Sequence, residues 1–113
     1  MPPMQWRIDK AKQLAQELWG TSEEELTSKR QFKHILYPRY ALMLLLNEKI
    51  GSTDDQIRKL FNMRRSTVTH GRKTASNWRG RDPHFTATYE SLQNAYQIEI
   101  EKHKDNQNGN TEN

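Results

Sequence analysis

The residues best suited to chemistry in this chain lie at the start of one predicted helix. In order, they are Arg64, Arg65, Ser66, Thr67, Thr69 and His70. Cationic side chains bind phosphates, while hydroxyls and the guanidinium fork match the donors and acceptors on base edges. Ser66 is the predicted N-cap of this helix. The helix then continues at regular spacing through Val68, Arg72, Ala75 and Trp78.

A second helix is predicted directly before this one. Thr53 suits an N-cap and Gln56 can return the hydrogen bond, which is a capping-box pattern. Asp54 and Asp55 fall in the first turn, where the helix dipole favours negative charge. One buried face follows at Ile57, Leu60 and Phe61. The next residue is an asparagine, which tolerates a left-handed turn, so the pattern predicts a helix-turn-helix over residues 53–78.

Positive charge is concentrated around this motif. The net charge is +4, but residues 29–81 hold thirteen Lys and Arg against three acids, and the rest holds five against eleven. A basic run often marks only a solvated surface. Beside a helix-turn-helix it favours a surface for a polyanion, because neutralised phosphates release counterions.

Length and composition exclude several other classes of protein. A chain of 113 residues suits one domain with one modest core. It has no cysteine, so disulfide frameworks and thiolate metal sites are excluded. The longest apolar run, Tyr40–Leu46, is far shorter than the roughly 20 residues of a membrane span. With no signal pattern at the N-terminus, we expect a soluble cytoplasmic protein, associated with the nucleoid.

Nothing in the sequence favours an enzyme, a cofactor or a small-molecule substrate. No nucleophile with a matching base, no carboxylate pair with a plausible pocket and no glycine-rich phosphate loop is recognisable. Asp54 and Asp55 are better explained as first-turn acids than as metal ligands. The histidines are scattered, which favours surface or helix-end positions over zinc ligation: His34, His70, His84 and His103.

The elements before the motif are also predicted to be helical. Residues 5–19 form an amphipathic helix that Gly20 ends, and Ser22 opens a short second one. The basic segment 29–34 is predicted to be a loop or frayed turn. Pro38 suits the first turn of the next helix. That helix is apolar nearly all round and ends at Gly51, which predicts a central, buried position.

A last helix is predicted to follow Pro83, because the preceding helix cannot continue through this proline. Its apolar stripe comprises Phe85, Tyr89, Leu92 and Tyr96. The stripe either closes the core, which we favour, or pairs with a partner. Residues 104–113 are polar and predicted to be disordered. The sequence thus predicts an all-α fold of about five to six helices, with a single domain over 5–103.

Taken together, these motifs resemble the C-terminal DNA-binding domain of the bacterial replication initiator DnaA, which has a Trp-repressor-like helix-turn-helix. The similarity covers about residues 6–79 and includes IDKAKQLAQELWGTSEEELTSKRQ and the Tyr37-Pro38-Arg39 start of the apolar helix. The stretch Thr53–Phe61 is similar to the family's first motif helix, and Ser66–His70 to the Thr-Thr-Val-x-His end of its signature.

The resemblance implies three sets of contacts with double-stranded DNA. Base reading in the major groove would fall to Arg64, Arg65, Ser66 and Thr67. Phosphates would be held by Arg39, Thr53, Thr69, His70, Arg72 and Lys73. The adjacent minor groove would be reached by a basic loop of Lys29, Arg30, Gln31 and Lys33.

Departures from the family pattern predict a different site preference. The family has Asp-His where this chain has Arg64-Arg65, and the turn here is one residue shorter. Arg58 and Asp55 replace the family's glycine and proline, and Gln31 replaces a common basic residue. An arginine in the reading position suits guanine.

No ATPase is expected in this chain, because it has no GxxxxGK[ST] stretch. Met1 and the polar tail favour a stand-alone DNA-binding protein over a fragment of an initiator, with a role in replication initiation or its regulation. The alternative is a protein-interaction or adaptor module, homodimeric or bound to a replication protein through the last helix. RNA binding is less favoured, because no aromatic sheet or glycine-rich clamp is recognisable.

Overall fold

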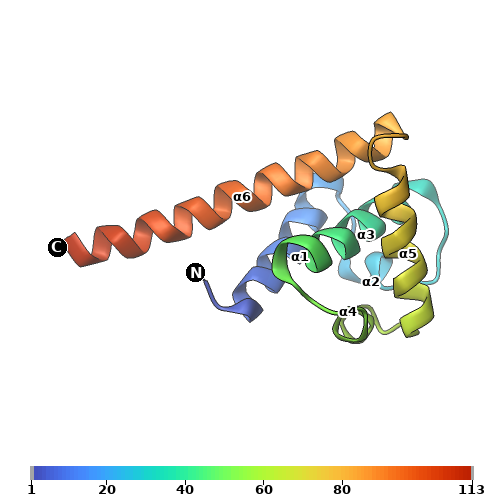
Figure 1. Cartoon of the computed structure of the whole chain (residues 1–113), viewed down its shortest axis with the longest axis horizontal. Helices are drawn as coiled ribbons and strands as arrows, with labels where there is room; N and C mark the ends of the chain where they lie inside the picture. Colours follow the sequence, from blue (N-terminus) through green and yellow to red (C-terminus); the bar gives the residue numbers. More distant parts are fainter. Residues whose placement is uncertain (1, 113) are drawn as a thin grey trace.

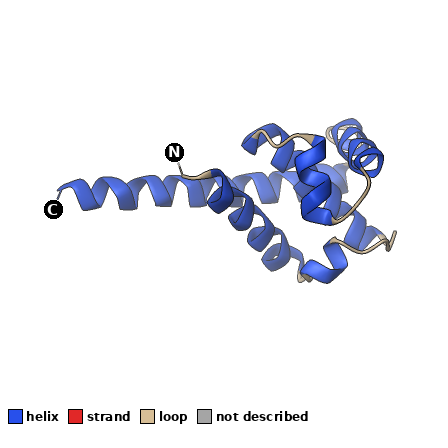
Figure 2. Cartoon of the chain, turned by 90° about the horizontal axis from the view of Figure 1, so that it is seen from below, coloured by secondary structure: helices blue, strands red, loops and turns tan. Residues whose placement is uncertain are grey.

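The chain is all-helical in a computed structural model, as its sequence predicts. The structure describes the backbone of residues 2–112 and the side chains of residues 2–104, and that part of the chain contains no strand. Figures 1 and 2 show a bundle of short helices from which one long helix projects. The elements are α1 (Met4–Trp19), α2 (Glu23–Leu26), α3 (Lys33–Leu45), the π-helical turn η1 (Leu46–Ile50), α4 (Asp54–Phe61), α5 (Arg65–Trp78) and α6 (Pro83–Glu112).

Helix α3 is the centre of the core, which confirms the prediction from its apolar sequence. All residues from 38 to 46 are buried, and α1, α2, α5 and α6 all pack against α3. A helix that is apolar on every side can be stable only in such a position. Gly51, at φ 82°, ends the element in the left-handed conformation that glycine adopts without steric cost.

The predicted start of α3 at Pro38 is wrong, because the helix begins at Lys33 and contains Pro38. The carbonyl of Phe32 accepts hydrogen bonds from the amides of Ile35 at 2.9 Å and Leu36 at 2.7 Å, which forms the first turn earlier. Ile35 is buried and draws this turn onto the core. Burial thus outweighs the hydrogen bond that a proline inside a helix cannot donate.

Helix α6 closes the core with the predicted stripe. Phe85, Tyr89, Leu92 and Tyr96 are all buried, so this stripe is not available as a partner surface. The second half of α6 extends away from the bundle (Figure 1). Backbone described up to Glu112 is helical, which differs from the disorder predicted for 104–113. The side chains from 105 onward lie outside the described residues.

No helix in the described part of the chain is long and apolar enough to cross a membrane.

Candidate nucleic-acid interface

Helices α4 and α5 are joined by a short turn, as the sequence predicts. The capping box of Thr53 and Gln56 is present, with Gln56 N donating to Thr53 Oγ1 at 3.2 Å and Thr53 N to Gln56 Oε1 at 2.9 Å. Asn62 adopts the left-handed conformation at φ 53° and ends α4. The amide of Met63 donates to the Arg58 carbonyl at 3.0 Å, which fixes the exit of the turn.

The start of α5 differs from the prediction by two residues. Its N-cap is Arg64, in extended conformation, and Ser66 lies inside the first turn instead of capping it. The Arg64 side chain does not cap this end, although a helix N-terminus leaves several amide N–H groups without intrahelical acceptors. The positive end of the helix dipole therefore stays open to an anion.

Exposed polar and cationic side chains cover this end of α5. We refer to them as the α5 basic face, and they comprise Arg64, Arg65, Ser66, Thr67, His70 and Lys73. Helix α5 contains no acidic residue. Among the described residues, none of the cations of this face forms an ion pair. All four predicted base readers thus lie together at an open helix end.

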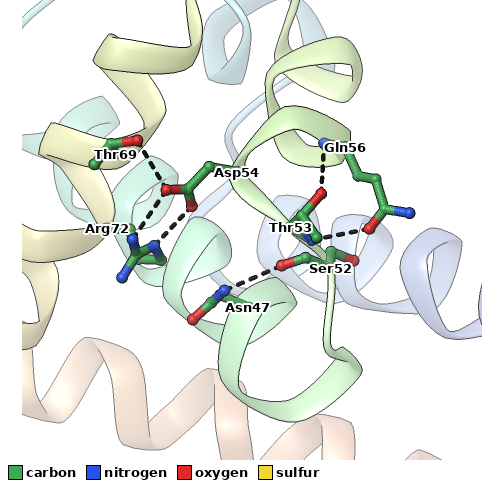
Figure 3. A network of polar contacts seen from close by, with 7 residues as sticks. All are labelled: Asn47, Ser52, Thr53, Asp54, Gln56, Thr69 and Arg72. Carbon is green, nitrogen blue, oxygen red and sulfur yellow. Dashed lines mark hydrogen bonds and ion pairs between the residues drawn. The ribbon is translucent and has the colours of Figure 1, made fainter.

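Two of the predicted phosphate contacts are engaged by the protein itself. Arg72 donates from Nε and Nη2 to the two carboxylate oxygens of Asp54, at 2.7 and 2.9 Å, and Thr69 Oγ1 donates to Asp54 Oδ2 at 2.8 Å (Figure 3). The Arg72 guanidinium lowers the pKa of the Asp54 carboxyl from its ordinary value to about 2. We refer to these three residues as the Asp54 clamp. Its role is to fix α5 against the first turn of α4.

The predicted phosphate contact of Thr53 is also limited by its neighbours, since its hydroxyl oxygen caps α4. The preceding residue is tied as well, because Asn47 Nδ2 donates to the carbonyl of Ser52 at 3.1 Å (Figure 3). These bonds connect η1 to the start of α4. The loop that leads into the helix pair is therefore held at both ends.

Gly71 allows α5 to approach α3 closely. A Cβ atom added at this buried glycine would lie 2.9 Å from Tyr40 Cε1 and 3.0 Å from Met43 Sδ. Real Cβ atoms essentially never approach neighbours closer than 3.0 Å, so any larger residue here requires the Tyr40 side chain or the two helices to shift. Gly71 thus sets the depth at which α5 sits on the core.

The C-terminal end of α5 is anchored by aromatic rings. Trp78 packs against Tyr37, Tyr40 and Phe85, with ring centroids 5.2, 5.7 and 5.6 Å apart. The Tyr37 hydroxyl donates to Asp82, whose other carboxylate oxygen accepts from the first amides of α6. The C-terminal end of α5 is thus packed in this cluster, and the N-terminal end of α5 points outward.

A second anchor holds the residue after Trp78. Arg79 pairs with Glu48 through both carboxylate oxygens, at 2.5 and 3.0 Å, and Tyr89 donates to the same carboxylate at 3.0 Å. Burial, followed by the neighbouring Glu48 carboxylate, raises the pKa of the Tyr89 hydroxyl. Arg79 is thus a structural cation, although it belongs to the basic part of the sequence.

The basic loop is exposed, and its shape depends on a buried arginine. Lys29, Arg30 and Gln31 are exposed in the loop, and Lys33 is exposed at the start of α3. In Figure 1 the connection from α2 to α3 lies at the same end of the molecule as α5, opposite the projecting end of α6. Both predicted contact regions therefore occupy one end of the protein.

Arg39 is predicted to hold phosphate, but the structure places it inside the protein. Its side chain is only 2% exposed, and Nε donates to the Leu26 carbonyl at 2.9 Å. Its Nη1 donates to the Arg30 carbonyl at 2.9 Å, and Nη2 to the Glu25 carbonyl at 3.1 Å. Arg39 therefore joins the end of α2 to the basic loop by donating to carbonyls of both segments. Its role is to position Arg30.

Comparison with protein-family models, with curated proteins and with solved structures finds no match to this chain. Its function is therefore inferred from the charge and geometry of the site.

Proposed function

We propose that the protein binds double-stranded DNA, with sequence preference, as a binding protein and not as an enzyme. In this proposal α4 and α5 act as a helix-turn-helix, and the N-terminal end of α5 enters the major groove. The basic loop at Lys29 and Arg30 contacts the adjacent minor groove. The observation that carries the proposal is the α5 basic face, a set of exposed donors and cations that form no ion pair within the described part of the chain. They lie at a helix end that the N-cap side chain leaves uncapped.

The physical properties of the α5 basic face suit duplex DNA. The major groove is wide enough for one α-helix, and arginine can donate to both O6 and N7 of guanine. Arg64 and Arg65 are exposed at the tip of α5, next to the hydroxyls of Ser66 and Thr67. His70 and Lys73 lie one and two turns further along and suit the phosphates. The roles thus divide into base reading at the tip and phosphate binding behind it.

The role in the cell follows from the resemblance to the DnaA C-terminal domain. We propose a role in replication initiation or in its regulation, carried out by DNA binding without an ATPase in this chain. The altered reading residues, Arg64 and Arg65, support recognition of a site other than the initiator's usual one.

Selection of bound duplexes from a random pool tests the proposal. The selected site is then titrated over a range of salt concentrations. We expect a defined motif that contains guanine, and an affinity that falls steeply with salt because phosphate contacts release counterions. Salt-dependent binding without a motif would contradict base reading by Arg64–Thr67. Absence of binding at low salt would contradict DNA binding altogether.

A further inference from the structure

One aromatic side chain in the basic loop region is largely exposed. Phe32 is 64% exposed, more than the other exposed large apolar side chains, Met4, Leu18 and Ile98. It follows Arg30 and Gln31 and precedes Lys33.

The backbone and the ring of Phe32 are both held in place. Its carbonyl accepts from two amides of the first turn of α3, those of Ile35 and Leu36. Its ring stacks on the ring of His34, with centroids 5.7 Å apart and planes 15° from parallel. Arg39, buried below, binds the carbonyl of Arg30 just ahead of it. Phe32 is therefore presented to the outside from an ordered support.

The surroundings of Phe32 indicate the chemistry of its partner. Residues 29–34 contain three cations, an amide and a histidine, and no acid. A partner for this segment has to offer negative charge and a flat apolar surface within a few ångströms of each other. Duplex DNA offers both, because phosphates flank stacked base pairs along the minor groove.

We propose that Phe32 inserts as an apolar wedge between two base pairs from the minor groove and kinks the duplex, while Arg30 and Lys33 hold the flanking phosphates. This inference rests on the proposed DNA binding. Apolar wedges of this kind unstack a base step and bend the duplex toward the major groove. Pyrimidine–purine steps deform most easily, so the wedge favours a TA or CA step opposite the loop.

The test uses the full chain and the duplex recovered by selection. The adenine analogue 2-aminopurine, placed at successive positions, reports unstacking by its fluorescence, and energy transfer between dyes at the two ends reports bending. With the wild type we expect a fluorescence rise at one step only, together with a shorter distance between the ends. Phe32→Ala removes both signals, whereas Phe32→Leu, which keeps an apolar wedge, retains them in part.

The matched control is Ile98→Ala, which removes another exposed apolar side chain from the distant helix α6 and should leave both signals unchanged. Binding by the wild type without unstacking or bending would overturn the wedge and leave the proposed DNA binding intact. Equal signals for wild type and Phe32→Ala would also overturn it. If the wild type binds no duplex at all, the proposed function fails, and the wedge fails with it.

Discussion

At its N-terminal end α5 exposes Arg65, Ser66 and Thr67, whereas at its C-terminal end Trp78 packs among three aromatic rings. Both ends belong to one helix of fourteen residues. The packed end supplies the stability that the charged end does not. A rigid helix anchored at one end can present reading residues at the other without ordering them on binding.

The cations of the basic region also fall into two groups, those bound within the protein and those left exposed. Arg72 and Arg79 are paired with carboxylates, and Arg39 is buried against carbonyls. Arg65 and Lys73 form no ion pair among the described residues. Positive charge in the sequence thus has two uses here. Arg72 and Arg79, bound to carboxylates of other elements, set the position of α5, and cations such as Arg65 and Lys73 are left for a partner.

The largest expected effect is at the packed end of α5. Trp78→Ala should lower the free energy of unfolding by about 3 kcal/mol, because it removes a large ring from the aromatic cluster. Urea denaturation measures the change. The matched control is Asn77→Ala, an exposed neighbour whose loss should change stability by less than about 0.5 kcal/mol. If the two variants are equally stable, the aromatic cluster is not the anchor.

At the exposed end of α5 the expected effect is on binding instead of stability. Arg65→Ala should leave the unfolding transition unchanged and lose about 1–3 kcal/mol of preference at one base position. Lys73→Ala is the contrasting variant, and it should weaken binding to all sequences and reduce the slope of affinity against salt by about 1. Binding titrations on the selected site and its single-base variants measure both. Identical losses on every sequence would contradict the division of roles.

The Asp54 clamp, between the two ends, should respond to pH. The pKa of the Asp54 carboxyl is lowered to about 2 in the folded protein, from an ordinary value of 3.8, chiefly by its hydrogen bonds from Arg72. A lowered carboxyl pKa stabilises the fold above pH 4, and this contribution is lost as the pH falls toward 2. Asp54→Asn should therefore cost about 1–2 kcal/mol at pH 7, after allowance for solvent screening, and almost nothing near pH 2.

Urea denaturation at a series of pH values measures the Asp54 effect. The matched control is Asp55→Asn, because Asp55 is more exposed than Asp54 and its ion pairs are with Arg58 and Lys59 of its own helix. Its effect should be clearly smaller at every pH. A constant difference between wild type and Asp54→Asn down to pH 2 would mean that the carboxylate charge does not hold α5.

The smallest expected effect is at Gly71, in the middle of α5, where this helix lies against α3. Gly71→Ala gains about 1 kcal/mol in helix propensity but forces a methyl group against Tyr40 and Met43, which costs about 1–3 kcal/mol. We expect a net loss of about 1 kcal/mol, measured by thermal or urea unfolding. A stabilised variant would show that α3 and α5 separate easily.

Much of the fold was predictable because its signals are local. The capping boxes at Ser22 and Thr53 and the left-handed residue Asn62 are read from neighbouring residues, and all are present. The all-apolar helix is central, and the stripe that begins at Phe85 is buried. Each of these features depends on residues that are close together in the sequence, so the sequence pattern alone was enough to predict it.

The errors arise where the folded structure places a residue in an environment that its type alone does not indicate. Pro38 marks a helix start in isolation, but burial of Ile35 begins α3 five residues earlier. Ser66 is a better N-cap than Arg64 by type, yet the turn after Asn62 places Arg64 in that position. The phosphate contact of Arg39, which only the resemblance implies, is wrong because its guanidinium donates to carbonyls of α2 and the basic loop.

The sequence by itself determined the helices, the buried stripes and the concentration of positive charge, because these follow from residue type and spacing along the chain. Only the tertiary structure decided which cations are available. Asp54 and Arg72 are eighteen residues apart, and Glu48 and Arg79 are thirty-one apart, so no local pattern connects them. Packing of α4, α5 and η1 brings each pair together, and this leaves the α5 basic face and the basic loop exposed.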